Sequence, residues 1–203
     1  EVTAAFEAAL GKTLFPGQLE RLLLNVATYR ELLIRLGIQY AAEQNLVNYA
    51  VGINLDQLGA LLAVERLAAS AATVTLQFSR SATAGDLIIP AGSSARQPGS
   101  SVLFTTDTDA TIANGQTSTT VTASASAMDT NGNGFSVGTI TQLVEVPAGI
   151  TAVTNTAASA GGANTETDEA FRTRIKLAPN RFSVAGSKGA YKFHALSADV
   201  SII

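Results

Sequence analysis

The segment Asp129–Gly134 (Asp-Thr-Asn-Gly-Asn-Gly) has the residue spacing that comes nearest to a known chemistry in this chain. Acidic or amide side chains alternate with other residues and end in a glycine, as in the first half of a calcium-binding loop. Such a loop completes its oxygen cage with a carboxylate six residues after the glycine, and Ile140 stands at that position. Strands rather than helices are predicted on both sides. The pattern therefore favours a structural loop, because glycine and asparagine tolerate left-handed backbone angles.

Side chains that could perform catalysis are scarce. His194 is the only histidine, and its helical spacing from Tyr191, without a G-x-S-x-G elbow, indicates a residue on a helix rather than a catalytic base. Asp107 and Asp109 lie in a polar turn with nothing to make one an acid and the other a base, which glycosidase chemistry requires. The absence of cysteine excludes disulfides and thiolate metal sites. We therefore predict no catalytic residue, no cofactor, no metal ligand and no enzymatic activity.

The composition indicates a protein that works through contacts with other proteins. Charged residues make up 14% of the chain, against roughly 25% in an ordinary globular domain. A surface with few charges is poorly protected against association, which favours a subunit covered by its neighbours. The net charge of -3 argues against a nucleic-acid partner, and no apolar run reaches the ~20 residues that cross a bilayer. We expect protein partners, no nucleic acid, no membrane, and assembly in the cytoplasm.

Charge is unevenly distributed along the second half of the chain. No basic residue occurs between Arg96 and Arg172, whereas only basic charges occur from Arg172 to Lys192, and the next acid is Asp199. Two readings stay open. The charges form ordinary solvated faces, or the basic C-terminal part meets an acidic surface of another subunit and fixes its register.

The N-terminal part predicts helices. A short helix is expected over residues 3–10, and a long one from Pro16 to Ala50, about 50 Å in length at 1.5 Å per residue. Such a helix can bury a seam against its own domain or against a second protomer, and both readings stay open. Another short helix is predicted over residues 55–63, with Asn54 as its N-cap. The seam recurs every seven residues in two sets, with Glu43 as a polar exception: Leu19, Val26, Leu33, Tyr40 and Val47, and Leu22, Tyr29, Leu36 and Ala50.

The middle of the chain predicts an antiparallel sheet or a small sandwich built from short strands. Residues 73–79 alternate polar and apolar side chains, which is the period of a half-buried strand. Phe78, Phe104 and Phe135 stand where core residues would. The other predicted strands cover residues 87–92, 102–106, 110–113, 119–125, 139–146 and 150–154.

The C-terminal part predicts two further helices after a small-residue hinge at Gly161-Gly162. Thr165 or Thr167 can cap the first helix, Pro179-Asn180 stops it, and Ser187 opens the second. The predicted buried face of the first helix is Phe171, Ile175 and Ala178, and residues in line on the second are Tyr191, Ala195 and Ala198.

The predicted class is therefore α+β. We expect an N-terminal helical region over residues 1–70, an antiparallel β domain over 71–156, and the start of a truncated α+β region over 157–203. Residues 200–203 are predicted to begin a strand, so the chain is expected to be a fragment.

Taken together, these features resemble the baseplate J-like family of contractile phage tails. The resemblance covers nearly the whole chain and includes Pro90-Ala91-Gly92 in the β domain. Its most specific part runs from Gly161-Gly162 to Tyr191. The residues that carry it, which are candidates for interface roles, are Leu55, Asp56, Leu58, Arg66, Gly161, Gly162, Glu166, Glu169, Arg172, Arg174, Gly186 and Tyr191.

The resemblance implies a structural wedge subunit of a tail baseplate, or of a related tail-like injection particle. Such a subunit associates with like copies and with other wedge proteins, and it resides in the virion after assembly in the host cytoplasm. A host-surface or glycan-binding β module is the alternative, and it should carry exposed aromatic residues on its strands.

Overall fold

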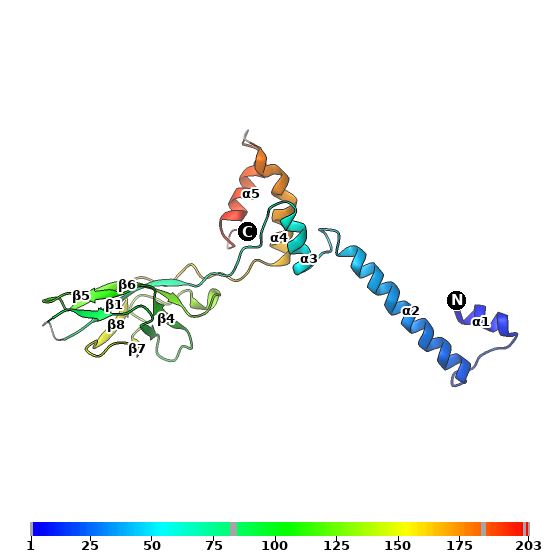
Figure 1. The fold of residues 1–203 in the computed structure, drawn as a ribbon, viewed down its shortest axis with the longest axis horizontal. Coiled ribbons are helices and arrows are strands. Elements are labelled where there is room, and N and C mark those ends of the chain that lie inside the picture. Colours follow the sequence, from blue (N-terminus) through cyan, green and yellow to red (C-terminus); the bar gives the residue numbers. More distant parts are fainter. Residues whose placement is uncertain (1, 82–84, 184–185, 201, 203) are drawn as a thin grey trace. The chain divides into compact units, whose positions relative to one another are not determined.

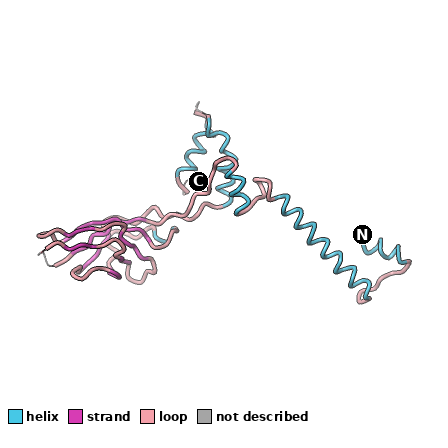
Figure 2. The backbone as a smooth tube through the Cα atoms, in the orientation of Figure 1, coloured by secondary structure: helices cyan, strands magenta, loops and turns pink. Residues whose placement is uncertain are grey.

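The structure is a computed structural model that describes residues 2–81, 85–183, 186–200 and 202. The chain forms two compact units, Glu1–Val64 and Glu65–Ile203, which we describe separately. Helices occupy both ends of the chain and strands occupy its middle (Figure 1, Figure 2). The predicted α+β class is confirmed.

The first unit contains three helices, of which the second is shorter than predicted. Asn45 donates its side-chain amide to the carbonyl of Ala41 at 2.8 Å, and the Gln44 side chain accepts the backbone N–H of Val51 at 3.0 Å. These local bonds turn the chain after Glu43, so the prediction of a helix up to Ala50 is wrong. The helix is about 38 Å long instead of about 50 Å. The three helices are α1 (Val2–Leu10), α2 (Leu19–Glu43) and α3 (Ile53–Ala60).

Helix α2 leaves its apolar seam uncovered within the first unit, where none of its residues is buried. Leu19 and Val26 expose 69% and 67% of their surface, and Leu33 exposes 49%. At 100° per residue, apolar side chains cover about half of the circumference. The opposite side carries polar residues, among them the ion pair of Glu31 and Arg35. The first unit therefore does not provide the intramolecular cover that one reading of the sequence expected.

Helix α3 begins earlier than predicted. Its N-cap is Gly52, whose φ of 53° lies in the left-handed region. Asn54 lies inside the helix instead of capping it, and its side-chain amide donates to the Gln44 side chain at 3.3 Å.

The second unit begins with an antiparallel β structure. A six-stranded sheet has the order β7-β3-β4-β6-β1-β8, and β2 pairs with β5 in a separate two-stranded sheet. The two edge strands, β7 and β8, contact each other, so the larger sheet is nearly closed. We call residues 73–155 the barrel. Its strands are β1 (Thr73–Ser79), β2 (Leu87–Ile89), β3 (Ser94–Arg96), β4 (Leu103–Thr106), β5 (Ala110–Ile112), β6 (Ser118–Ala125), β7 (Gln142–Glu145) and β8 (Ala152–Asn155).

Alternate residues of these strands form one apolar core, as the two-residue period predicts. Phe78 on β1 and Phe104 on β4 are fully buried. Phe135 packs edge-on against Phe104, with ring centroids 5.3 Å apart. The predicted core positions of these phenylalanines are confirmed.

Two strand predictions are wrong in detail. The segment predicted as a strand over residues 139–146 pairs only at β7, while Ile140 is buried in the core. Strand β3 was not predicted, because Ser94-Ala95-Arg96 has no apolar alternation. It forms because Thr106 accepts the backbone N–H of Ser93 at 3.1 Å and donates to the carbonyl of Pro90 at 3.0 Å. These bonds hold the preceding turn against β4.

The chain ends in α4 (Asp168–Leu177), the 3-10 helix η2 (Ala178–Phe182) and α5 (Lys188–Ala198). Thr167 and Ser187 cap the two α-helices as predicted, accepting from the backbone N–H groups of Ala170 and Ala190. The predicted buried face of α4 is also confirmed. On α5 the buried residues are Ala190 and Phe193, whereas Tyr191 is 70% exposed.

Two further expectations concern the end of the sequence and membrane spans. The final strand was predicted over residues 200–203, and Ser201 and Ile203 lie outside the described residues. None of the helices in the described ranges combines the length and the apolar content that a membrane span requires.

Substitution Gly132→Ala is expected to destabilise the second unit. A Cβ at this position would lie 2.8 Å from the Cβ atoms of both Ala72 and Ala125, and overpacking of this kind costs about 1–3 kcal/mol. Urea unfolding followed by circular dichroism measures the loss. The control is Gly37→Ala in α2, where a Cβ meets nothing within 4 Å and helix propensity favours alanine by about 1 kcal/mol. Equal effects of the two substitutions would refute the steric account.

Candidate functional site

The chain enters and leaves the barrel through two adjacent segments, residues 65–72 and 157–167, which we call the neck. Ser70 and Ala163 exchange backbone hydrogen bonds of 2.9 and 3.0 Å, and Thr73 and Ala160 exchange bonds of 2.8 and 3.1 Å. The two segments therefore run antiparallel. The barrel is an insertion whose ends are held side by side.

A buried ion pair lies at the end of the neck that adjoins α4. The Arg174 guanidinium donates to both carboxylate oxygens of Glu166, from Nε to Oε1 and from Nη2 to Oε2, each at 2.7 Å. The side chains expose only 4% and 3% of their surface. Because Thr167 starts α4, Glu166 lies just before the helix and Arg174 lies two turns into it. The pair is therefore set by the local fold.

The remaining polar groups of this pair reach three residues in two other parts of the second unit, the first neck segment and α5. Arg174 also donates to the carbonyl of Glu65 and to the hydroxyl of Ser197 on α5 at 3.3 Å. Glu166 accepts the backbone N–H of Leu67 at 3.0 Å. One ion pair thus joins both neck segments, α4 and α5.

Arg66 and Phe171 complete the group. Arg66 donates to the carbonyl of Glu166 at 2.7 Å and to the Asp168 carboxylate at 2.6 Å. Both guanidinium groups make cation–π contacts with the ring of Phe171. The guanidinium carbon lies 4.8 Å from the ring centroid for Arg66 and 5.5 Å for Arg174. Cation–π contacts of this kind add about 0.5–2 kcal/mol each. We call Arg66, Glu166, Asp168, Phe171 and Arg174 the ion-pair cluster.

The energetics of the cluster favour a role in holding segments together. Desolvation of a buried pair consumes much of its Coulomb attraction, so such a pair adds little net stability. Removal of one partner leaves a buried charge without compensation, which costs about 3–5 kcal/mol. Both carboxylates of the cluster accept from guanidinium groups. The cluster therefore specifies one arrangement of the neck against the C-terminal helices.

The segment Asp129–Gly134 lies at the barrel end of the neck, where its polar side chains bond to one another and to the neck. Asp129 accepts the backbone N–H and the side-chain amide of Asn131, each at 2.8 Å. Asn133 exchanges hydrogen bonds with the backbone of Gly162, donating at 2.7 Å and accepting at 2.8 Å. A Cβ at Gly162 would lie 2.4 Å from the carbonyl oxygen of Asp129. The segment is a loop that fastens the neck to the barrel, and only glycine fits beside it.

Gly186 and Tyr191, two of the candidate residues from the sequence, lie next to each other at the start of α5. Gly186 has a φ of 70°, and a Cβ there would lie 3.3 Å from the Tyr191 hydroxyl oxygen. The ring therefore lies beside the glycine at the start of α5. Gly189 has a comparable role that the sequence did not reveal, because a Cβ would lie 2.7 Å from the Asn180 side chain.

Residues that the sequence singled out fall into separate groups. Arg66, Glu166 and Arg174 meet in the ion-pair cluster. Glu169 and Arg172 form an ion pair one helical turn apart, in which Glu169 exposes 83% of its side chain. The remaining candidates are Gly161 and Gly162 in the neck, Gly186 and Tyr191 at α5, and Leu55, Asp56 and Leu58 on α3 in the first unit.

Sequence reasoning missed the cationic partners of Phe171, the neck-binding role of Asn133, and the backbone partners at Glu65 and Leu67. Phe171 was predicted only as an apolar core residue. The contacts across the neck join residues about a hundred positions apart, so no local pattern could reveal them.

Known proteins supply two matches along the chain. Residues 21–73 match the baseplate J-like N-terminal domain, and residues 75–162 match the baseplate J-like protein barrel domain. Among solved structures, the chain is similar to a chain in the cryo-EM structure of the anti-feeding prophage (AFP) baseplate, with 16% identity and a TM-score of 0.44. That similarity covers 86% of this chain and 49% of the other, so this chain spans about half the length of its neighbour. No curated protein sequence matches.

Substitution Glu166→Gln is expected to lower the free energy of unfolding of the second unit by about 3 kcal/mol, because it leaves the buried Arg174 charge unpaired. Urea unfolding measures the change. The matched control is Glu169→Gln, which breaks an ion pair whose carboxylate is exposed and is expected to cost less than about 1 kcal/mol.

A second variant separates charge from packing. The double substitution Glu166→Leu/Arg174→Met replaces the buried charges with apolar groups, and it is expected to be more stable than Glu166→Gln. Similar losses for Glu166→Gln and Glu169→Gln would contradict the buried-pair account.

Proposed function

The chain belongs to the baseplate J-like family, and from this premise we propose that it is a structural subunit of a tail baseplate. The particle is a contractile phage tail, in which the chain is a wedge component, or a related tail-like injection particle. The observation that supports this most is the order of the two matches, because the N-terminal and barrel domains follow one another over residues 21–162. In this role the protein resides in the baseplate of the virion and is assembled in the host cytoplasm.

The proposed mechanism is mechanical and requires no turnover. The chemistry-bearing groups of the neck are engaged with one another, so they hold segments in place. His194 is exposed on α5 and lies edge-on to Phe193, with ring centroids 5.5 Å apart. The barrel phenylalanines point into the core, which disfavours the alternative of a glycan-binding module that stacks sugars on exposed aromatic rings.

Like copies and other wedge proteins are the proposed partners, and α2 is the element best suited to meet them. Its apolar sector runs from Leu32 through Leu33 to Ile34, about 200° around the helix at 100° per residue. A two-stranded coiled coil buries a narrower stripe than this. We therefore propose that α2 packs against more than one neighbouring helix, at least one of them from a second copy.

Particle assembly tests the proposed function. Deletion of the gene in a strain that produces the particle is expected to give particles without baseplates by negative-stain electron microscopy, and the intact gene is expected to restore them. His194→Ala should restore them equally well, because the role needs no imidazole. Normal baseplates without the chain would refute a structural role, and failure of His194→Ala with a folded protein would favour catalysis.

Substitution Leu33→Glu is expected to abolish the self-association that runs through α2, because it places a charge at the centre of the apolar sector of this helix. Sedimentation velocity of the full chain at about 100 µM measures the oligomeric state. The control is Ala42→Glu, which adds the same side chain at an exposed position on the polar side of the same helix. Circular dichroism checks that both variants keep their helices. A monomeric wild-type chain, or equal effects of the two substitutions, would refute a contact through α2.

A further inference from the structure

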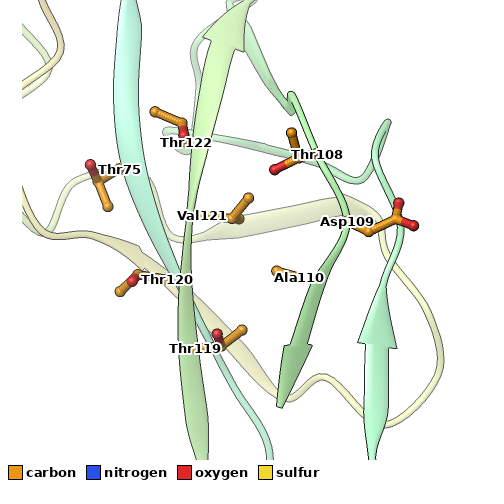
Figure 3. Close-up of a pocket in the computed structure, with 8 residues that line it drawn as sticks. All are labelled: Thr75, Thr108, Asp109, Ala110, Thr119, Thr120, Val121 and Thr122. Atoms are coloured by element: carbon orange, nitrogen blue, oxygen red, sulfur yellow. The ribbon is translucent and has the colours of Figure 1, made fainter. Parts of the chain in front are cut away.

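A shallow groove on the barrel offers oxygen acceptors and negative charge. It has a volume of about 390 Å³ and is lined by residues of β1, β6 and the turn before β5. Thr75, Thr120 and Thr122 contribute hydroxyl-bearing side chains (Figure 3). Asp109 also lines the groove, and one of its carboxylate oxygens accepts the backbone N–H of Ala91 at 2.8 Å. The backbone N–H of Asp107 donates to the carbonyl of Thr122 at 3.0 Å, so a second, exposed aspartate is bonded through its backbone to a residue of the groove.

The cations of the barrel are engaged by other groups. Arg80 is buried and donates to the carbonyls of Gly85, Ala113 and Gln116. Arg96 donates to the Gln142 side chain at 3.0 Å. No other lysine or arginine occurs in residues 73–155. The groove therefore favours a cationic ligand over an anionic or apolar one.

Lysine fits these features better than other cationic side chains. Its ammonium group is a compact charge with three donors, which suits several hydroxyl and carboxylate oxygens around one concave surface. Its methylene stem can lie along the methyl groups of threonine while the charge reaches the rim. An extended row of lysines on a helix would present such groups at the spacing of one turn.

Helix α5 carries two exposed lysines on one face. Lys188 and Lys192 are one turn apart, and Tyr191 lies within the same third of the helix circumference. All three are exposed, and they lie opposite the buried residues Ala190 and Phe193. Neither lysine has an ion-pair partner among the described residues, whereas Arg66, Arg172 and Arg174 are each paired. The Tyr191 ring lies beside Gly186 at the start of this face.

We infer that the barrel groove of one copy binds the Lys188–Tyr191–Lys192 face of α5 in a second copy. The inference rests on the proposed function as a subunit that occurs in several copies. Complementary charge supports the choice of partner, since one chain carries both the acidic groove and the lysine face. A contact between two different surfaces is heterologous, so it links copies head to tail into a ring or a chain.

Charge reversal provides a specific test with the full chain. The helix variant is Lys188→Glu/Lys192→Glu, and the groove variant is Asp107→Lys/Asp109→Lys. Each variant alone places like charges on both surfaces, and each is expected to weaken the contact about tenfold or more. An equimolar mixture restores opposite charges at every contact, so it should recover the wild-type assembly. Lys176→Glu, an exposed reversal on α4, is the control and should leave assembly unchanged.

Salt separates this contact from the one through α2. Sedimentation velocity at low salt should show wild-type species larger than those that depend on α2. At about 0.5 M salt these should dissociate, because surface charges are then screened over a few ångströms, whereas apolar contacts through α2 persist. The charge variants should keep the α2-dependent species, and Leu33→Glu should keep the salt-sensitive contact.

Three results would overturn the inference. The first is a wild-type chain without a salt-sensitive species beyond the α2-dependent one. The second is a mixture of the two variants that fails to recover assembly. The third is loss of the salt-sensitive species after nuclease treatment, which would assign the lysines to nucleic acid.

Discussion

The second unit depends on the requirement that the buried charges of Glu166 and Arg174 be satisfied on every side. Two charged side chains that expose 4% or less of their surface lose their hydration, and this cost is offset only if their donors and acceptors are matched. The partners come from Glu65, Leu67 and Ser197, which lie far apart in the sequence. A change in the angle between the neck and α4 would separate several of these bonds together. The pair therefore restricts the neck and the C-terminal helices to one arrangement.

The same principle explains why four charged side chains meet at one place in a chain that has few charges. The barrel, by contrast, is built largely from threonine, serine, alanine and apolar residues, whose desolvation costs less than that of charged side chains. Around the neck, arginine and carboxylate side chains supply directional bonds that apolar packing cannot supply. Directional bonds are thus concentrated where the neck meets the C-terminal helices, while the barrel surface carries few charges.

Much of the fold could be predicted from local patterns. Alternation over residues 73–79 and the threonine and serine caps at Thr167 and Ser187 depend on neighbours in the sequence, and the structure contains them. The end of α2 was missed because the side chains of Gln44 and Asn45 compete with the helix for hydrogen bonds, which the seven-residue apolar spacing does not record. Strand β3 was missed because it depends on Thr106, more than ten positions away. Among the candidate site residues, Arg66, Glu166 and Arg174 were identified individually, but their meeting across the neck could not be derived from spacing.

The adjacency of the two neck segments has a consequence for how such chains can diversify. The two neck segments are joined by backbone hydrogen bonds. The barrel residues between them therefore form a closed loop inserted into the rest of the chain. Closing a longer loop costs only about 0.6 kcal/mol more for each doubling of its length. Evolution can therefore lengthen, shorten or replace the inserted module while the helices that flank it keep their own packing. Selection on the module's outer surface is in this way uncoupled from selection on the frame that carries it.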